Sequence, residues 1–263
     1  MVEIPLTSGT KRATSAAIGN VARIRIVTGV GLLMFYELVA RSGLLYGAVV
    51  PSLLDIVWAL MNLLGSTAFY PHLMATVVEV VAGFLIGTCL GLMLGISFGL
   101  WRLLGEVLDP WIHYLAPTPK IIFLPILILL FGAGMGSKIA MGAVSAFFPV
   151  VVATYAGMRL VRPVLIRVAT SFQATSWQLI KMIYLPSLIA PAISAMRIGL
   201  GATIIGTLLA EIKMSREGIG FLIALDYSFL RVPEMYSLLI VVFVLALLAN
   251  SGMELLGRKL ARR

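Results

Sequence analysis

Charge is scarce in this chain, and so are the side chains that most enzymes use for catalysis. Only 12% of its 263 residues are charged, whereas 60% are hydrophobic, and soluble domains contain about a quarter charged residues. The chain has two histidines and one cysteine, Cys89, so no disulfide can form within one chain. With a mean hydropathy of +1.06, the composition indicates a membrane protein.

The sequence also lacks a motif for holding nucleotide phosphates. Residues 132–138 are rich in glycine, but they lack the Gly-Lys-Ser/Thr order of a Walker A loop and follow no predicted strand. His72 and His113 flank different apolar segments, which argues against a shared metal. We therefore expect no catalytic residue, no metal and no bound cofactor, and the energy for any activity must come from a gradient or a partner.

Long apolar runs are what the chain has instead. A run of about 20 apolar residues can span a bilayer as a helix, because every backbone N–H and C=O is then paired within the segment. The sequence predicts about six such spans, at residues 24–40, 73–100, 112–131, 139–158, 188–210 and 236–256. The third is the weakest, because Pro117, Pro119 and Pro125 interrupt it.

Basic side chains gather on one side of the predicted membrane. With six spans, this side carries Lys11, Arg12, Arg23, Arg25, Arg102, Arg159, Arg162, Arg167, Lys181, Arg258, Lys259, Arg262 and Arg263. The positive-inside rule makes it cytoplasmic, together with both termini. The net charge of +9 is thus explained by topology rather than by nucleic-acid binding.

Two segments are expected to form structure on the opposite side. Residues 51–55 should open a short helix that Ser52 caps, with Asp55 at the capping-box position. Residues 211–235 should be partly helical, and residues 132–137 should make a tight turn.

Glycine recurs at every fourth position of the second predicted span. The five residues are Gly83, Gly87, Gly91, Gly95 and Gly99. They form one bare stripe on a helix, and overlapping G-x-x-x-G pairs let two backbones approach closely. The stripe predicts a helix-packing face, either within this chain or at a moving or subunit interface.

Four ionisable side chains lie at membrane depth, where each calls for a functional hypothesis. For Glu79 we favour snorkelling or a helix contact over contact with a substrate, and for Glu211 we favour a structural contact. Lys120 and Arg197 are the candidates for a substrate pathway, although snorkelling by Lys120 and a structural pair for Arg197 are the alternatives.

A polar, basic stretch over residues 159–187 interrupts the apolar pattern between the fourth and fifth spans. The sequence predicts two short helices, at residues 163–172 and 175–183, with Thr175 or Ser176 capping the second and Pro186 ending it. A simple turn needs no such insert, so we interpret it as a docking surface. Its expected residues are Arg167, Ala169, Phe172, Gln173, Ala174, Thr175, Trp177, Leu179, Lys181, Leu185 and Pro186.

This stretch resembles the cytoplasmic loop of ATP-binding-cassette (ABC) importer permeases. Their pattern is Glu-Ala-Ala, three residues, Gly, about nine residues, then a hydrophobic residue, any residue and Leu-Pro. Arg167-Val168-Ala169 falls on Glu-Ala-Ala, Gln173 on the glycine and Leu185-Pro186 on the closing pair. The likeness extends over nearly the whole chain and is closest to the nitrate/sulfonate/taurine/bicarbonate branch. Further segments that carry it are Leu115-Ala-Pro-Thr-Pro119, Phe147-Phe-Pro149, Ala174-Thr-Ser-Trp-Gln-Leu179 and Gly218-Ile-Gly220.

Three positions depart from the family pattern. Arg167 replaces the acidic first residue of the loop motif, Gln173 replaces its glycine, and Glu79 stands where the family usually has a basic residue. A non-glycine residue at positive φ costs roughly 1 kcal/mol, so the departure at Gln173 predicts a reshaped turn.

The resemblance implies an all-α integral membrane protein of about six transmembrane helices with a cytoplasmic coupling-helix loop, the fold of type I ABC importer permeases. It implies a cytoplasmic N-terminal tail over residues 1–23 and a transmembrane permease domain over residues 24–257. The coupling loop would occupy residues 159–187 of that domain, and a basic cytoplasmic C-terminus residues 258–263. The protein would lie in the bacterial inner (cytoplasmic) membrane.

The resemblance also implies the partners and the activity. Two copies of an ABC ATPase subunit would use ATP, a second, identical permease would complete a homodimer in the lipid, and a periplasmic or lipid-anchored binding protein would deliver substrate. The cargo would be a small organic or inorganic anion of the sulfonate, taurine or nitrate class. A pyrimidine precursor or aromatic acid is the alternative within the branch. A stand-alone carrier or channel, which should show internal repeats and unwound helices, and a structural membrane protein are the alternatives outside it.

Overall fold

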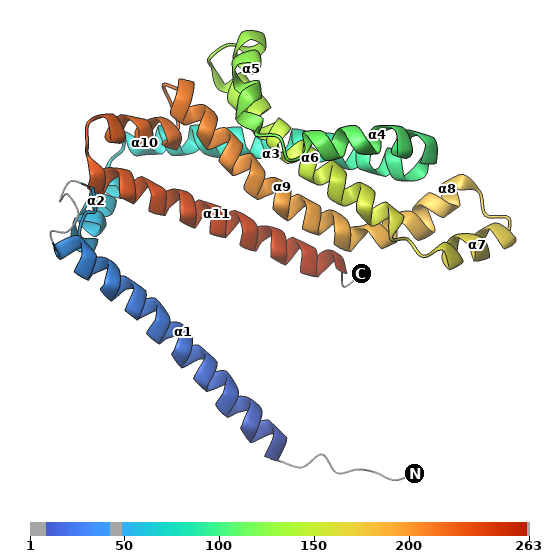
Figure 1. The fold of residues 1–263 in the computed structure, drawn as a ribbon, viewed down its shortest axis with the longest axis horizontal. Coiled ribbons are helices and arrows are strands. Elements are labelled where there is room, and N and C mark those ends of the chain that lie inside the picture. The colour runs from blue at the N-terminus through green and yellow to red at the C-terminus, as the bar shows by residue number, and fades with distance from the viewer. Residues whose placement is uncertain (1–8, 43–48, 262–263) are drawn as a thin grey trace.

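The computed structural model describes residues 9–42 and 49–261. Regular structure in these ranges is entirely helical (Figure 1). The elements are α1 Gly9–Arg41, α2 Leu53–Gly65, α3 Phe69–Leu100, α4 Arg102–Leu115, the 3-10 turn η1 Lys120–Phe123, α5 Leu124–Phe131, α6 Met135–Arg159, α7 Pro163–Ser171, α8 Ser176–Leu179, the π turn η2 Ile180–Tyr184, α9 Leu185–Met214, α10 Ile219–Ser228 and α11 Val232–Ala261.

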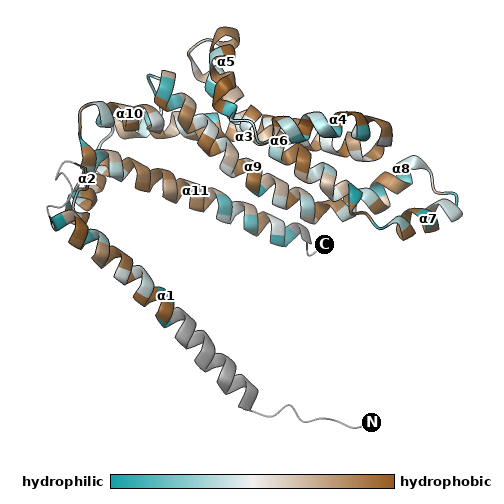
Figure 2. Ribbon diagram, in the orientation of Figure 1, coloured by the Kyte–Doolittle hydropathy of each residue, from teal (hydrophilic) through white to brown (hydrophobic). Residues whose placement is uncertain are grey.

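Helices α3, α6 and α9 form the centre of the molecule, with α6 between the other two. Ala146, Val150 and Val151 of α6 are fully buried there, as is Ala195 of α9. Helix α4 packs beside α3 and α6, and α11 packs on α9. Outside this centre, apolar side chains are widely exposed and hydrophobic residues run along the long helices (Figure 2). This is the inverse of a soluble domain and suits a lipid environment.

The glycine stripe is the reason that α3 and α6 pack so closely. Gly83, Gly87, Gly91 and Gly95 are buried against α6. A Cβ added at Gly87 would lie 2.3 Å from the carbonyl oxygen of Ala143, and one at Gly95 would lie 2.7 Å from Cβ of Thr154. The stripe therefore packs within this chain, the first of the two interpretations that the sequence left open.

Four helical segments among the described residues are long and apolar enough to cross a membrane. They are α3, α6, the continuous helix from α8 through η2 and α9, and α11. A fifth is possible if α4 and the η1–α5 segment count as one span. The span predicted at residues 24–40 is helical within α1, which is not among these segments.

The third predicted span, which its prolines marked as the weakest, is sharply bent. The chain turns by 96° between Leu103–Leu115 and Lys120–Phe131. Pro117 and Pro119 lie in the break, where each removes a backbone donor and disfavours helix in the residue before it. Helix α5 consequently projects away from the other helices (Figure 1).

The prediction that Pro186 ends the second loop helix is also wrong, because the helix continues from Ser176 to Met214. Pro186 lies in the first turn of α9, directly after the π turn. Inside a continuous helix a proline lacks the backbone N–H that would bond to the preceding turn, and its ring crowds that turn. The π turn thus lets the helix pass a residue that would otherwise break it.

Two of the smaller elements predicted on the other side are present, whereas the turn predicted at residues 132–137 is shorter than expected because α6 already begins at Met135. Ser52 caps α2 by accepting a hydrogen bond from the backbone N–H of Asp55, and α10 provides the expected helical part of residues 211–235. Helix α1 is fastened near α2, where Glu37 accepts a 2.9 Å hydrogen bond from the N–H of Leu53 and Tyr36 donates to the carbonyl of Pro51 at 3.0 Å. The rest of α1 extends away from the body (Figure 1).

Candidate functional site

The α7–α8 loop projects from one end of the α3–α6–α9 centre (Figure 1). Phe172 is 84% exposed and Trp177 is 70% exposed, which leaves two large aromatic side chains without cover in this chain. Of the residues predicted for the docking surface, Arg167, Gln173, Thr175, Lys181, Leu185 and Pro186 are exposed as well, whereas Ala169, Ala174 and Leu179 are half-buried. The loop thus brings the predicted set together on one projecting element.

The two loop helices have the lengths and the cap that their residues favour. Helix α7 covers Pro163–Ser171, close to the prediction, while α8 has only four residues before η2 continues it. Thr175 caps α8 in a reciprocal capping box with Gln178. The N–H of Gln178 donates to Oγ1 of Thr175 at 3.3 Å, and the N–H of Thr175 donates to Oε1 of Gln178 at 2.8 Å. These bonds fix where α8 begins.

The turn between α7 and α8 has the backbone shape that a glycine would provide. Gln173 occupies it with φ of 55°, and the N–H of Ala174 donates to the carbonyl of Ala169 at 3.0 Å. The left-handed conformation is therefore kept despite the missing glycine, and the turn is not reshaped as the sequence led us to expect. Ala174 is small enough for a partner to approach closely at this corner.

We expect Gln173→Gly to stabilise the loop, because glycine adopts positive φ without the cost of about 1 kcal/mol that a side chain incurs. Backbone hydrogen exchange at residues 172–176 should slow by up to roughly fivefold, which corresponds to about 1 kcal/mol. Gln178→Gly in α8 is the control and should speed exchange instead. Faster exchange in Gln173→Gly would contradict the assignment of strain to this turn.

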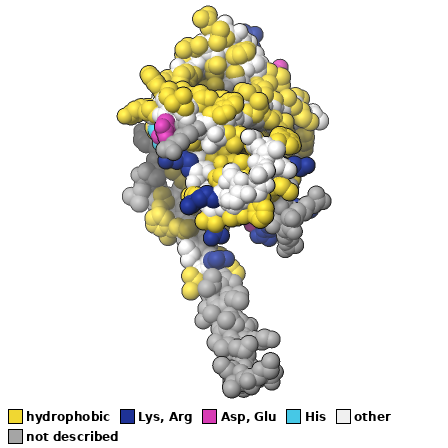
Figure 3. All heavy atoms as spheres, turned by 90° about the vertical axis from the view of Figure 1, so that its right-hand side faces the viewer, with side chains coloured by type: hydrophobic (Ala, Val, Ile, Leu, Met, Phe, Trp, Pro, Cys, Tyr) yellow, Lys and Arg dark blue, Asp and Glu magenta, His cyan; other side chains and the backbone are white. Residues whose placement is uncertain are grey.

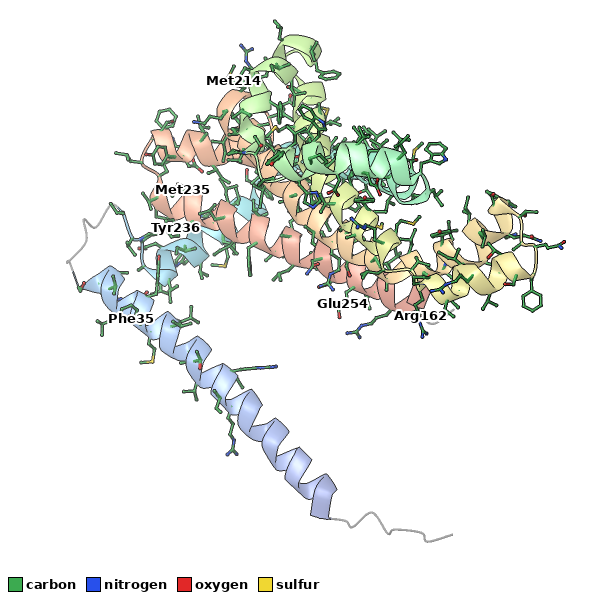
Figure 4. The ribbon with its side chains drawn as sticks, turned by 45° about the vertical axis from the view of Figure 1, so that its right-hand side comes forward. Phe35, Arg162, Met214, Met235, Tyr236 and Glu254 are labelled. Atoms are coloured by element: carbon green, nitrogen blue, oxygen red, sulfur yellow. The ribbon has the colours of Figure 1, made fainter. Side chains whose placement is uncertain are left out.

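The loop itself carries positive charge. Residues 159–187 contain Arg159, Arg162, Arg167 and Lys181 but neither Asp nor Glu. Figure 3 views the molecule from this end and shows Lys and Arg side chains set among hydrophobic and other surface. Arg162 and Glu254 of α11 lie at this end of the molecule, and Met214 and Met235 lie at the other (Figure 4). A partner that fits here needs an apolar recess for the aromatics and acidic groups around it.

The two candidate pathway cations do not share a site. Lys120 lies on the wall of a cavity of about 570 Å³ between η1, α6 and α9. Arg197 lies in a separate groove between α9 and α11, where its Nε donates to Oδ1 of Asn250 at 3.1 Å. The sequence placed both at membrane depth but could not show on which side of its helix each one lies.

A buried polar network joins four helices near the end opposite the loop. Glu79 of α3 is fully buried and pairs with Lys138 of α6, which is 4% exposed, with 2.9 Å between Oε1 and Nζ. Lys138 also donates to Oγ of Ser215 at 2.7 Å. Glu79 thus makes a helix contact, which is one of the two roles favoured from the sequence, rather than snorkelling. The lysine partner was missed, because Lys138 directly follows the turn predicted at residues 132–137 and no local pattern pairs it with Glu79.

Glu211 is the second centre of this network. Its carboxylate accepts hydrogen bonds from the Thr76 hydroxyl at 2.7 Å and from the N–H of Gly220 at 2.6 Å. A Cβ at Gly218, where φ is 106°, would lie 2.4 Å from Cδ of Glu211. The glycines of Gly218-Ile-Gly220 therefore allow the backbone to wrap the carboxylate, which fixes the start of α10 on α3 and α9. The expected structural contact of Glu211 is present.

Residues 87–263 match the family described as "Binding-protein-dependent transport system inner membrane component". The chain belongs to this family. It is an inner-membrane, multi-pass permease subunit of an ABC importer, and it works with an ATPase and a substrate-binding protein. A transmembrane subunit of this family has no ATPase site and binds no cofactor, because the partner subunit handles ATP.

Relatives of known name are similar over most of their length. The chain is 30% identical over 231 residues to the "Putative aliphatic sulfonates transport permease protein SsuC" of Bacillus subtilis (strain 168), with 88% of this chain and 84% of the relative covered. It is 28% identical over 234 residues to the taurine transport system permease protein TauC of Escherichia coli (strain K12), with 87% and 85% covered.

A solved structure has the same fold. A chain of the MetNI methionine ABC transporter superimposes with a TM-score of 0.63 at 17% identity and covers 78% of this chain and 97% of that chain.

Proposed function

We propose that this permease imports a small anion of the sulfonate class, and that two identical copies form the membrane unit of the importer. The relatives named for aliphatic sulfonates and taurine support the cargo class. The exposed apolar length of α1, with Ile26 and Val27 at least 65% exposed, supports a second copy or lipid as its cover.

The projecting α7–α8 loop is the observation that carries the mechanism. We assign it as the docking surface of two ATPase subunits, one on each permease copy. Phe172 and Trp177 would enter an apolar recess of the ATPase, while Arg167 and Lys181 would select a partner with acidic groups at the rim. The turn at Gln173 and Ala174 would be the point of closest approach.

The helices on either side of the loop suit it to pass movements of the ATPase to the membrane-spanning helices. Helix α6 leads into it, and α9 leads out of it. A rocking motion of the docked loop would therefore move both central helices against α3 and switch the pathway between its two faces. The loop side would be cytoplasmic, with residues 1–23 and 258–263 as cytoplasmic ends and residues 24–257 as the transmembrane domain. Helix α11 ends near the loop (Figure 1), which supports this orientation. A periplasmic or lipid-anchored binding protein would then approach the opposite end.

We expect Ala174→Glu to leave the permease inserted but to release the ATPase, because a charged side chain would occupy the corner that a partner must approach. Trp177→Asp should do the same by removing an aromatic anchor, for which losses of 2 kcal/mol or more are typical at interfaces, equivalent to roughly 30-fold in affinity. The measurement is co-purification of the ATPase together with ATP-driven sulfonate uptake into vesicles.

The control is Phe229→Asp, which changes an aromatic residue that is 62% exposed after α10, at the end away from the loop. It should keep the ATPase bound. If both loop variants retain the ATPase and ATP-driven uptake, the docking assignment is wrong. Uptake that persists without ATP in the wild type, with ion gradients present, would indicate a secondary carrier instead.

A further inference from the structure

The cavity between η1, α6 and α9 has the size of a small-molecule site. Its volume is about 570 Å³, within the range of roughly 300–1,000 Å³ that ligand sites occupy. Its walls are mostly hydrocarbon, from side chains such as Ile121, Pro149, Ile205 and Leu209. Ala153 of α6 and Ala202 of α9 also line the cavity, and their short side chains leave space that a larger residue would fill.

Lys120 places a fixed positive charge on this wall. Its Nζ donates to the carbonyls of Ala116 at 2.5 Å, Thr118 at 2.6 Å and Leu115 at 3.3 Å. It also lies 5.1 Å from the ring centre of Phe148. Within the part of the chain that the structure describes, no carboxylate forms an ion pair with it. The bond of 3.3 Å is the weakest of the three, so this donor is the one that an incoming anion could take over.

Apart from Lys120, the cavity wall offers few groups that can form hydrogen bonds. Ser145 is the lining hydroxyl, and it already donates to the carbonyl of Met141 at 2.8 Å. A strongly hydrated ion or a zwitterion would lose water here and regain few hydrogen bonds, which is unfavourable. A ligand with a hydrocarbon group binds more tightly instead, because each methylene buried in the cavity raises its affinity by about fourfold.

We propose that this cavity is a half-site for the cargo, and that the cargo is an organic anion with one anionic head and a hydrocarbon body of several carbons. This inference rests on the proposed function and narrows it, since it favours alkyl or aryl sulfonates over nitrate and taurine. The head lies near Lys120 and the body lies against α6 and α9. Ile198 and Ile205 at its edge are 59% and 63% exposed, so the second copy completes the enclosure.

The position of the cavity favours cargo over lipid as its occupant. Two of its walls, α6 and α9, are the helices that the α7–α8 loop joins (Figure 1). A displacement of the docked loop that shifts α6 relative to α9 would therefore change the width of the cavity. A lipid tail would find hydrocarbon on much of the protein surface, but it would not supply a counter-charge for Lys120.

The test uses the permease–ATPase complex in lipid nanodiscs without binding protein. Radiolabelled hexanesulfonate is the probe, and methanesulfonate, butanesulfonate, taurine and nitrate are competitors. We expect affinity to rise by about fourfold per methylene and taurine and nitrate to compete poorly. Lys120→Met should weaken hexanesulfonate at least tenfold, and Lys120→Arg should restore part of that loss. Neutral hexanol, measured as a competitor, should be unaffected by either change.

Ala202→Leu should fill the cavity and remove the advantage of the longer chain, so that hexanesulfonate binds no better than butanesulfonate. The matched control is Gly201→Leu, one residue along α9, where an added Cβ meets nothing within 4 Å; it should leave the chain-length series unchanged. This arm keeps the proposal testable even if Lys120→Met fails to fold.

Several results would overturn the proposal. The first is an absence of saturable hexanesulfonate binding, which is expected if lipid or the second copy fills the space. The second is an affinity that does not change with the length of the alkyl chain. The third is loss of binding in Arg197→Gln but not in Lys120→Met. The proposed function is judged separately, by ATP-driven uptake with the binding protein present. Uptake with a flat series would overturn only the cavity assignment, whereas absence of any ATP-driven sulfonate uptake would overturn the function.

Discussion

Lys138→Met is expected to destabilise the permease by about 3–5 kcal/mol, because it leaves the fully buried carboxylate of Glu79 without its cation. Methionine keeps most of the side-chain volume, so the loss reports charge rather than packing. The measurement is chemical or thermal unfolding of the purified protein in detergent. The yield of folded protein should fall with it.

The double variant Glu79→Gln with Lys138→Met is the decisive control. It removes both charges, and replacing a buried pair by neutral groups is often close to neutral in stability. We therefore expect the double variant to recover most of the loss seen in Lys138→Met. A double variant as unstable as the single one would show that Lys138 acts mainly through Ser215, to which it donates at 2.7 Å, or through packing.

Gly87→Leu is expected to prevent close packing of α3 on α6. Its Cβ would lie 2.3 Å from the carbonyl oxygen of Ala143, and a backbone atom inside a helix cannot move aside. Overpacking typically costs 1–3 kcal/mol, and we expect about the upper end here, seen as a lower unfolding midpoint and loss of monodisperse protein. Gly91→Leu should be damaging but milder, since its Cβ would meet the side chain of Val150 at 2.8 Å.

Cys89→Leu is the matched control for this series. Cys89 lies on the same helix but is exposed, so added bulk should point to lipid and leave assembly intact. Normal assembly and transport of Gly87→Leu would show that the helices can separate without loss, and the tight α3–α6 contact would then be dispensable.

Much of the fold follows from the sequence because long apolar runs and polar interruptions are local signals. The runs predicted at residues 73–100, 139–158, 188–210 and 236–256 lie within α3, α6, α9 and α11. Thr175 was identifiable as a cap from its side chain and its place before the helix. The path after Pro117 and Pro119 was not, since prolines indicate that a helix breaks but not the direction in which the chain continues.

The sites were less predictable, because they depend on which residues meet across the membrane. Residue counting gives the depth of Lys120 or Arg197, but tertiary packing decides that one lines the cavity and the other contacts Asn250. Glu79 and Lys138 are far apart in sequence, and no local pattern pairs them. Gln173 shows a further limit, since the turn keeps its shape at an energetic cost that the surrounding helices impose.

The π turn Ile180–Tyr184 gives the chain length of this segment an importance beyond its composition. An α-helix advances by about 100° per residue, so the angular phase between Trp177 on α8 and Ala202 on α9 depends on how many residues lie between them. Losing one residue here would swing the aromatic docking residues around the helix axis while leaving the cavity wall in place. Side chains in this segment can vary, but the number of its residues sets the direction in which a movement of the docked ATPase is passed to α9.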